Sequence, residues 1–302
     1  MRSQLVYGLV IGATVFWGAN FELAGPVLAD LPPLWAAALR FLLGAMIMFM
    51  IARVRKEDLV SAARAHFGVY LLLGLVGIGA FNLFFFYAME DTSAVNAALI
   101  MATNPLLTTL LAALVLGERP NARHLFGLPL ALLGVTIVIS GGNPQRLLNL
   151  HIARGDILML LANTAWAIYN ILVRRLMPAR SALTNTTLVM TAGAAVLFIV
   201  ALSTGGALHL PGVKAGTALI LMTLGGTVLA YLFWNTAIAR LGAGHTALFL
   251  NLVPVFAMLI GITLGSVPSL PQFAGGILVM SGISLSMLPK RQPALRQETC
   301  KG

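Results

Sequence analysis

The sequence predicts an all-α integral membrane protein of ten transmembrane helices, arranged as two inverted repeats of five helices each. Three observations lead to this fold class. The chain of 302 residues is 59% hydrophobic and 9% charged, with a mean hydropathy of +0.93, which is too apolar for a soluble surface. Ten apolar stretches, each of the roughly 20 residues that cross a bilayer core, nearly exhaust its length. The two halves also repeat each other at an offset of 148 to 149 residues.

Short polar breaks separate the predicted spans and leave no room for a soluble domain. The spans cover residues 4–28, 33–52, 67–89, 93–115, 123–141, 155–177, 182–203, 215–238, 244–265 and 271–288. Because Arg2 precedes the first span, that span could be mistaken for a secretory signal peptide, in which a basic residue precedes an apolar run. That span is long, carries Asn20 and Glu22, and recurs at 155–177, so we interpret it as a retained helix.

Matched residues define the repeat. Trp17 falls on Trp166, the Ala98-Leu99 step on Ala247-Leu248, Pro105 on Pro254, Gly117 on Gly265, and the Gly127/Gly134 pair on Gly275/Gly282. Because each half has an odd number of spans, the second half enters the membrane from the opposite face. We assign residues 1–145 to the N-terminal repeat, and residues 146–302 to the C-terminal repeat with a short cytoplasmic tail. The two matched prolines predict kinks or hinges within their spans.

The net charge of +10 is distributed as in a membrane protein rather than a nucleic-acid-binding one. Fifteen of the 19 lysines and arginines fall in segments on one side of the spans, three fall on the other side, and Arg40 lies within a span. The positive-inside rule then places both termini in the cytoplasm, and we expect a multi-pass protein of a bacterial inner membrane. Cys300 is the only cysteine, which excludes an intrachain disulfide, and we expect neither a metal nor a cofactor.

Polar and aromatic side chains at mid-membrane depth are the candidates for a solute site, because such groups are costly in lipid. The predicted substrate-binding set is Trp17, Asn20, Asn82, Phe86, Tyr87, Asn96, Trp166, Tyr169, Asn170, Tyr231, Trp234 and Asn251. Trp17 and Asn20 share one helical face, and the sixth span repeats this pattern. An amide can donate to a carboxylate and accept from an ammonium group. Interhelical hydrogen bonding and aromatic packing remain the alternative interpretation of the same residues.

Two permanently charged groups lie at mid-depth, and they allow two interpretations. Glu22 in the first span and Arg40 in the second could form a buried ion pair that holds the two helices together. Alternatively, Glu22 titrates during a functional cycle, or Arg40 meets a substrate carboxylate. His245 aligns with Asn96 of the first half and lies near the cytoplasmic end of the ninth span. It is either a histidine exposed to solvent or a pH-sensitive gate.

Several short motifs carry a resemblance to a known family. They are Phe16-Trp17-Gly18-Ala19-Asn20, then Pro33, Ala37, Arg40 and Phe41, then Asn104-Pro105-Leu106-Leu107, and finally Leu116-Gly117-Glu118. On these motifs the chain resembles the drug/metabolite transporter superfamily, and within it the EamA-type ten-helix carriers. It is most similar to bacterial exporters of amino acids and related metabolites, including exporters of aromatic amino acids. The resemblance implies a cavity lined mainly by spans one, three, four, six, eight and nine. The second half departs from the pattern at Leu264-Gly265-Ser266, which lacks the acidic residue.

The sequence therefore predicts a secondary transporter that exports small organic solutes, aromatic or neutral amino acids first among them, by alternating access between the repeats. Efflux of organic cations stays open, because Glu22 has aromatic neighbours. A channel is a further alternative. An enzyme is disfavoured, since the chain has no HExxH or GxSxG motif and its histidines fall near span ends. The expected partners are a small solute and the lipid bilayer, with no nucleic acid, and we expect a monomer.

Overall fold

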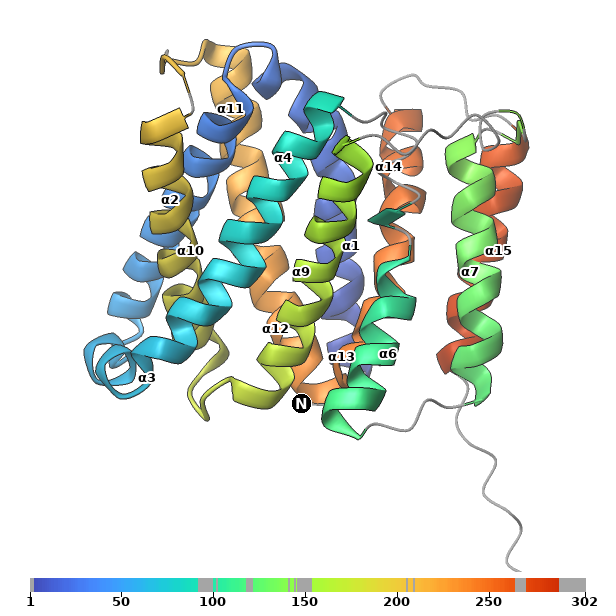
Figure 1. The fold of residues 1–302 in the computed structure, drawn as a ribbon, viewed down its shortest axis with the longest axis horizontal. Helices are drawn as coiled ribbons and strands as arrows, with labels where there is room; N and C mark the ends of the chain where they lie inside the picture. The colour runs from blue at the N-terminus through green and yellow to red at the C-terminus, as the bar shows by residue number, and fades with distance from the viewer. Residues whose placement is uncertain are drawn as a thin grey trace, which may run out of the picture.

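The computed structural model describes residues 3–91, 100–101, 103–117, 122–140, 142–143, 145, 154–204, 206–208, 210–263 and 270–287. Within the helices it leaves some side chains undescribed, including those of Glu22 and Phe86. The described residues form helices without strands, and the long helices run side by side through the molecule (Figure 1). This agrees with the predicted all-helical class.

The first half of the chain forms α1 (Ser3–Leu28), α2 (Pro33–Val54), α3 (Leu59–Gly74), η1 (Leu75–Ala80), α4 (Phe81–Asp91), α6 (Asn104–Leu116) and α7 (Ala122–Ser140). The second half forms α9 (Arg154–Leu176), α10 (Ala182–Thr204), α11 (Val213–Leu221), η2 (Met222–Leu229), α12 (Ala230–Leu241), α13 (Ala243–Leu248), η3 (Phe249–Asn251), α14 (Leu252–Thr263) and α15 (Leu270–Met287). Within the described residues, six helical stretches are long and apolar enough to cross a membrane, namely 33–54, 59–85, 154–176, 182–204, 213–241 and 243–263.

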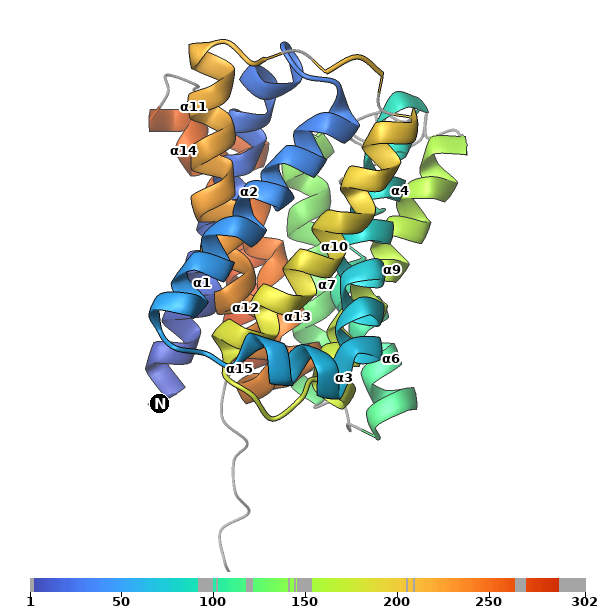
Figure 2. The same ribbon diagram turned by 90° about the vertical axis from the view of Figure 1, so that its left-hand side faces the viewer.

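The third helix begins earlier than the sequence predicts. It starts at Leu59, where the Asp58 carboxylate accepts a hydrogen bond of 3.1 Å from the backbone N–H of Ser61. The backbone then bends at His66 (φ −133°, ψ 29°), one residue before the predicted start of the span. Figure 2 shows the first part of α3 lying across the ends of the neighbouring helices. The hydropathy pattern therefore located the span and missed the short helix that leads into it.

Two π-helical segments interrupt the helices at matched places in the sequence. Residues Leu75–Ala80 form η1 and residues Met222–Leu229 form η2, so each lies within a long apolar span. Side chains approach the backbone closely at glycines in both segments: the ring of Tyr169 lies against Gly77, and the amide of Asn20 lies against Gly226. A Cβ at either glycine would collide with these groups. π-Segments inside α-helices occur frequently at functional sites.

Both matched prolines lie in the first turn of an α-helical segment. Pro105 occupies the first turn of α6, which begins at Asn104, and Pro254 is the third residue of α14, which follows the 3-10 turn η3. Proline is tolerated in a first helical turn because the N–H groups there have no intrahelical acceptor. At Pro254 the helical stretch 243–263 is continuous and changes locally to a 3-10 turn, and a hinge at either proline stays a prediction.

The helices of the two halves interleave. The principal contacts between helices of the two halves are α2 and α3 with α10, α4 with α9, α1 with α12 and α14, α6 with α9, and α6 with α13. At one edge α7 and α15 pack mainly against each other (Figure 1). Their backbones meet at glycines: a Cβ at Gly134 would lie 2.5 Å from the carbonyl oxygen of Gly275, and one at Gly282 would lie 2.5 Å from that of Gly127.

Candidate solute site

Four aromatic rings from both halves of the chain meet in the core. The ring centroid of Trp17 on α1 lies 5.6 Å from that of Trp166 on α9, with the two planes nearly perpendicular. Trp17 also lies 5.0 Å from Trp234 and 6.1 Å from Tyr231, both on α12, and Trp166 lies 5.7 Å from Tyr231. These separations are those of interacting aromatic pairs. The sequence predicted all four residues as site residues, and the structure brings them together.

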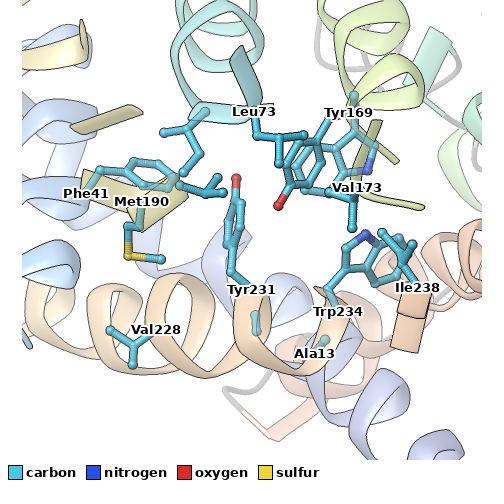
Figure 3. Close-up of a cluster of buried hydrophobic side chains, with 14 of the residues drawn as sticks. Ala13, Phe41, Leu73, Tyr169, Val173, Met190, Val228, Tyr231, Trp234 and Ile238 are labelled. Atoms are coloured by element: carbon cyan, nitrogen blue, oxygen red, sulfur yellow. The ribbon is translucent and has the colours of Figure 1, made fainter. Parts of the chain in front are cut away.

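Three further aromatic side chains extend this cluster. Tyr169 and Phe81 lie 5.3 Å and 5.1 Å from Trp166, and Phe41 on α2 lies 5.7 Å from Tyr231. Figure 3 shows Tyr231 and Trp234 projecting from one helix toward Tyr169 on another. We use "aromatic cluster" for Trp17, Phe41, Phe81, Trp166, Tyr169, Tyr231 and Trp234. Its members come from α1, α2, α4, α9 and α12.

Hydrogen bonds fix the polar ends of several rings. The indole N–H of Trp17 donates to the carbonyl of Gly226 in η2 over 2.9 Å. The indole N–H of Trp234 donates to Oδ1 of Asn170 over 2.9 Å, and the hydroxyl of Tyr169 donates to Oδ1 of Asn235 over 2.7 Å. Buried tryptophan and tyrosine usually find such partners. The rings are therefore held in defined orientations.

Some polar side-chain atoms in the protein core are buried and have no hydrogen-bond partner among the described residues. They are Oδ1 of Asn20, Nε of Arg40, Nδ2 of Asn170, Oγ1 of Thr227 and Nδ2 of Asn251. A buried polar atom without a partner costs about 1–3 kcal/mol. Several such atoms in one core are typical of a place where a polar solute is received, because a solute would satisfy them.

Arg40 lies at the edge of the aromatic cluster. Its guanidinium carbon sits 4.8 Å from the ring centroid of Phe41, a cation–π distance. The phenol of Tyr231 lies close enough to Arg40 to interact electrostatically, and the amide of Asn82 lies beside the same phenol. Asn82 also donates to the carbonyl of Ile78 in η1 over 2.8 Å. The suggested pairing of Arg40 with Glu22 stays a prediction, because the Glu22 side chain lies outside the described residues.

The other predicted site residues fall in different places. Tyr87 donates its hydroxyl to Thr204, the last residue of α10, over 3.2 Å, which places it near one end of the helices rather than at mid-depth. Asn251 is buried in the 3-10 turn η3. The side chain of Phe86 and the whole of Asn96 lie outside the described residues. His245 is partly buried against Tyr7 and Phe249, so it is not fully solvated.

A second polar cluster, formed by Asn104 and Asn163 with their neighbours, was absent from the predicted set. The Nδ2 group of Asn104 donates to Oδ1 of Asn163 over 2.6 Å, and Thr108 donates to Oδ1 of Asn104 over 3.0 Å. Asn163 in turn donates to Thr103 and to the carbonyl of Ile100, both over 2.8 Å. These bonds join the start of α6 to α9, across the two halves. Asn235, which holds Tyr169, was likewise absent from that set.

The fold and the buried polar and aromatic core define a multi-pass helical membrane protein of the transporter class. The EamA-like transporter family matches the chain twice, at residues 4–140 and at residues 153–288. The chain belongs to this family, and through it to the drug/metabolite transporter superfamily. The family and the relatives described next are transporters rather than enzymes.

The relatives match over nearly their whole length. The uncharacterized transporter YyaM of Bacillus subtilis is 36% identical over 285 residues, which are 94% of this chain and 93% of that protein. A protein of Salmonella typhimurium named "Probable amino-acid metabolite efflux pump" is 30% identical over 299 residues, which cover 92% of this chain and 93% of that protein. A crystal structure with 21% sequence identity superposes with a TM-score of 0.80 and covers 95% of this chain and 98% of its own, which shows a shared fold.

Proposed function

We propose that the protein is a secondary transporter that exports small organic solutes, chiefly aromatic or neutral amino acids and related metabolites, by alternating access at a site between its two halves. The observation that carries this proposal is the contact of Trp17 with Trp166, because these residues occupy the same position in the two halves and meet inside the molecule. A solute held between such residues is exposed to either side when the halves rock.

The architecture that we propose consists of two inverted five-helix repeats, residues 1–145 and 146–302. The two matches to the family begin 149 residues apart, which supports a duplication. Contacts between helices also recur under this shift. The contact of Asn20 with Gly226 corresponds to that of Tyr169 with Gly77, since 20 and 77 become 169 and 226 when 149 is added.

Glycine contacts elsewhere in the fold also recur when residue numbers are shifted by the repeat offset. Gly44 packs against Thr227, and the equivalent residues Gly193 and Ile78 pack against each other. In the α7 and α15 pair, the contacts of Gly134 with Gly275 and of Gly282 with Gly127 exchange under a shift of 148 residues. A two-fold relation between the halves predicts such reciprocal pairs. Since each half has an odd number of spans, the two-fold axis would lie in the membrane plane.

The chemistry of the candidate site supports a solute with an apolar body and polar ends. The aromatic cluster offers ring faces, while Asn20 and Asn170 offer a buried acceptor and a buried donor. The printed name of the Salmonella relative points to the same solute class. Because one chain contains both halves, we propose that a monomer in the inner membrane is sufficient. With no phosphate-binding GxxxxGK[ST] motif in the sequence, the driving force is a solute or ion gradient.

Counterflow in proteoliposomes tests the transport proposal. Vesicles loaded with unlabelled phenylalanine should accumulate external radiolabelled phenylalanine transiently and saturably, and empty vesicles should not. Flux that rises linearly with concentration would instead identify a channel. Counterflow of tetraphenylphosphonium without any of phenylalanine or leucine would favour the organic-cation alternative, to which the indole faces of Trp17, Trp166 and Trp234 are also suited.

Cysteine labelling tests the inverted topology. In a Cys300→Ser background, single cysteines replace Arg64, before the third span, or Arg180, before the seventh. The positive-inside assignment expects both cysteines to react with an impermeant maleimide only from the cytoplasmic side. Labelling from opposite sides would contradict five spans in each half. A cysteine replacing Lys214 serves as the control and should react from the outside.

A further inference from the structure

We infer that Arg40 and Asn20 together recognise the two charged ends of an amino-acid zwitterion, with Arg40 holding the carboxylate and Asn20 accepting from the ammonium group. This inference rests on the proposed transport function and specifies the solute class at the same site. Arg40 is the only lysine or arginine in the middle of a predicted span, since Arg123, Arg174 and Arg175 lie at the ends of theirs. A single guanidinium matches the charge of one carboxylate and is insufficient for a phosphate dianion.

The position of Arg40 points to a carboxylate. Its Nε is buried and has no hydrogen-bond partner among the described residues. Phe41 lies under the guanidinium and Tyr231 packs on Phe41, so the surroundings of Arg40 are aromatic, and the charge is weakly screened. A charge-assisted hydrogen bond from such a donor to a carboxylate is stronger than one between neutral groups.

The position of Asn20 points to the ammonium group. Its Oδ1 is a buried acceptor without a partner in the described part of the chain. The amide lies against Gly226, which has no side chain to displace it, and Trp17 one turn away donates to the carbonyl of that same glycine. An ammonium group bound at Asn20 would also lie near the indole of Trp17, whose face attracts cations.

The π-helical segment η2 brings the two residues to one region. Asn20 contacts Gly226, and Thr227, the next residue, contacts Gly44, which lies one turn along α2 from Arg40. Tyr231, one turn further along this helix, is a neighbour of both Arg40 and Trp17. Thr227 also has a buried hydroxyl without a partner among the described groups. Asn20 and the turn of α2 that follows Arg40 thus contact adjacent residues of η2.

The pair of Arg40 and Asn20 occurs in the first half alone, although the helix contacts around it occur in both halves. Under the shift of 149 residues, Arg40 corresponds to Val189 and Asn20 corresponds to Tyr169. Val189 has no polar group, and the hydroxyl of Tyr169 is already bonded to Asn235. A single copy of the donor and acceptor fits one zwitterion bound in one orientation.

Three solutes that share a phenyl ring test the inference: phenylalanine, phenethylamine, which lacks the carboxylate, and 3-phenylpropionate, which lacks the ammonium group. In wild-type proteoliposomes, phenylalanine should compete for phenylalanine counterflow at least about tenfold more strongly than either analogue, because each analogue loses one charged contact. Equal competition by all three would overturn the inference while leaving transport itself established.

Variants then separate the two contacts. Arg40→Met should lower the competition by phenylalanine and by 3-phenylpropionate about tenfold and leave phenethylamine within about twofold. Asn20→Leu should weaken phenylalanine and phenethylamine and leave 3-phenylpropionate unchanged. Arg53→Met, at an exposed arginine on the same helix, is the matched control and should behave as wild type.

The outcomes distinguish this inference from its rivals. If Arg40 only forms an ion pair with Glu22, Arg40→Met and Glu22→Gln should change all three solutes alike, and the inference fails. If Arg40→Met does not fold, Arg40→Lys and the wild-type competition series still decide, since a lysine keeps the carboxylate preference that the inference requires. Absence of counterflow by any solute would refute the proposed function itself.

Discussion

Close packing at the glycines of α7 and α15 predicts a specific loss of stability. A Cβ at Gly134 would lie 2.5 Å from the carbonyl oxygen of Gly275 and 2.6 Å from the backbone nitrogen of Val279. Real Cβ contacts are essentially never shorter than 3.0 Å, so Gly134→Ala must push the helices apart by at least 0.5 Å. Because the neighbours are backbone atoms, no side-chain rotation relieves the contact.

The size of the effect follows from overpacking. Extra methyl groups in a well-packed interior cost about 1–3 kcal/mol. Helices in lipid associate through van der Waals contact, so separating them along this seam also loses attraction between neighbouring residues. In a chain of this size we expect the apparent melting temperature to fall by about 2–10 °C. Gly282→Ala, the reciprocal change, should cost a similar amount.

Thermal unfolding of the purified protein in detergent, followed by tryptophan fluorescence or by loss of the monomer peak, measures this shift. Gly216→Ala in α11 is the control, because a Cβ there meets nothing within 4 Å. That variant should melt as the wild type does or slightly higher, since alanine favours a helix by up to about 1 kcal/mol over glycine. If Gly134→Ala and Gly282→Ala are as stable as Gly216→Ala, the reasoning from backbone contact is wrong.

Two further predictions concern hydrogen bonds. Trp17→Phe removes the indole donor to the carbonyl of Gly226, and Trp35→Phe removes the one to the carbonyl of Gly206. Only Trp17→Phe should change solute preference in counterflow, because Trp35 forms its hydrogen bond near the end of α10. Asn104→Leu removes the donor to Oδ1 of Asn163, so thermal unfolding should show a loss of about 1–3 kcal/mol of stability. Unchanged melting in the second case would show that the network can be satisfied in another way.

Much of the helical pattern was predictable from composition, because lipid requires long apolar segments whose backbone groups are bonded within the helix. α1 (Ser3–Leu28), α10 (Ala182–Thr204) and α15 (Leu270–Met287) begin and end within one residue of the predicted spans. The pattern failed at the start of α3, where a short helix containing Arg64 follows a charged segment and is separated from the span by the bend at His66. Hydropathy also contains no signal for η1 and η2, because a π-segment has the same composition as the α-helix around it.

The aromatic part of the candidate site was predictable because tryptophan is uncommon in this chain and recurs at the repeat offset, as Trp17 and Trp166 do. Of the hydrogen-bond partners, Asn170 was in the predicted set, whereas Asn163 and Asn235 were not. Asn163 and Asn235 lie on helical faces that the sequence alone does not distinguish from lipid-facing ones, and their importance appears only when another helix is placed against them. A buried network depends on the relative rotation of two helices, and a single span contains no information about that rotation.

The glycine contacts are the same in both halves whereas the polar residues differ, and this difference is relevant to the transport mechanism. Gly77 and Gly226 are equivalent positions, and each receives a side chain from the other half, yet those side chains are the phenol of Tyr169 in one case and the amide of Asn20 in the other. Equivalent packing contacts would give the inward-open and outward-open states similar energies, which a carrier needs in order to exchange between them. A solute such as an amino acid has no two-fold symmetry, so the groups that bind it cannot be duplicated without leaving one set unpaired. Under the proposed mechanism, selection would keep the glycine contacts symmetric and let the polar residues diverge, and the position of the divergent residues is where the solute should bind.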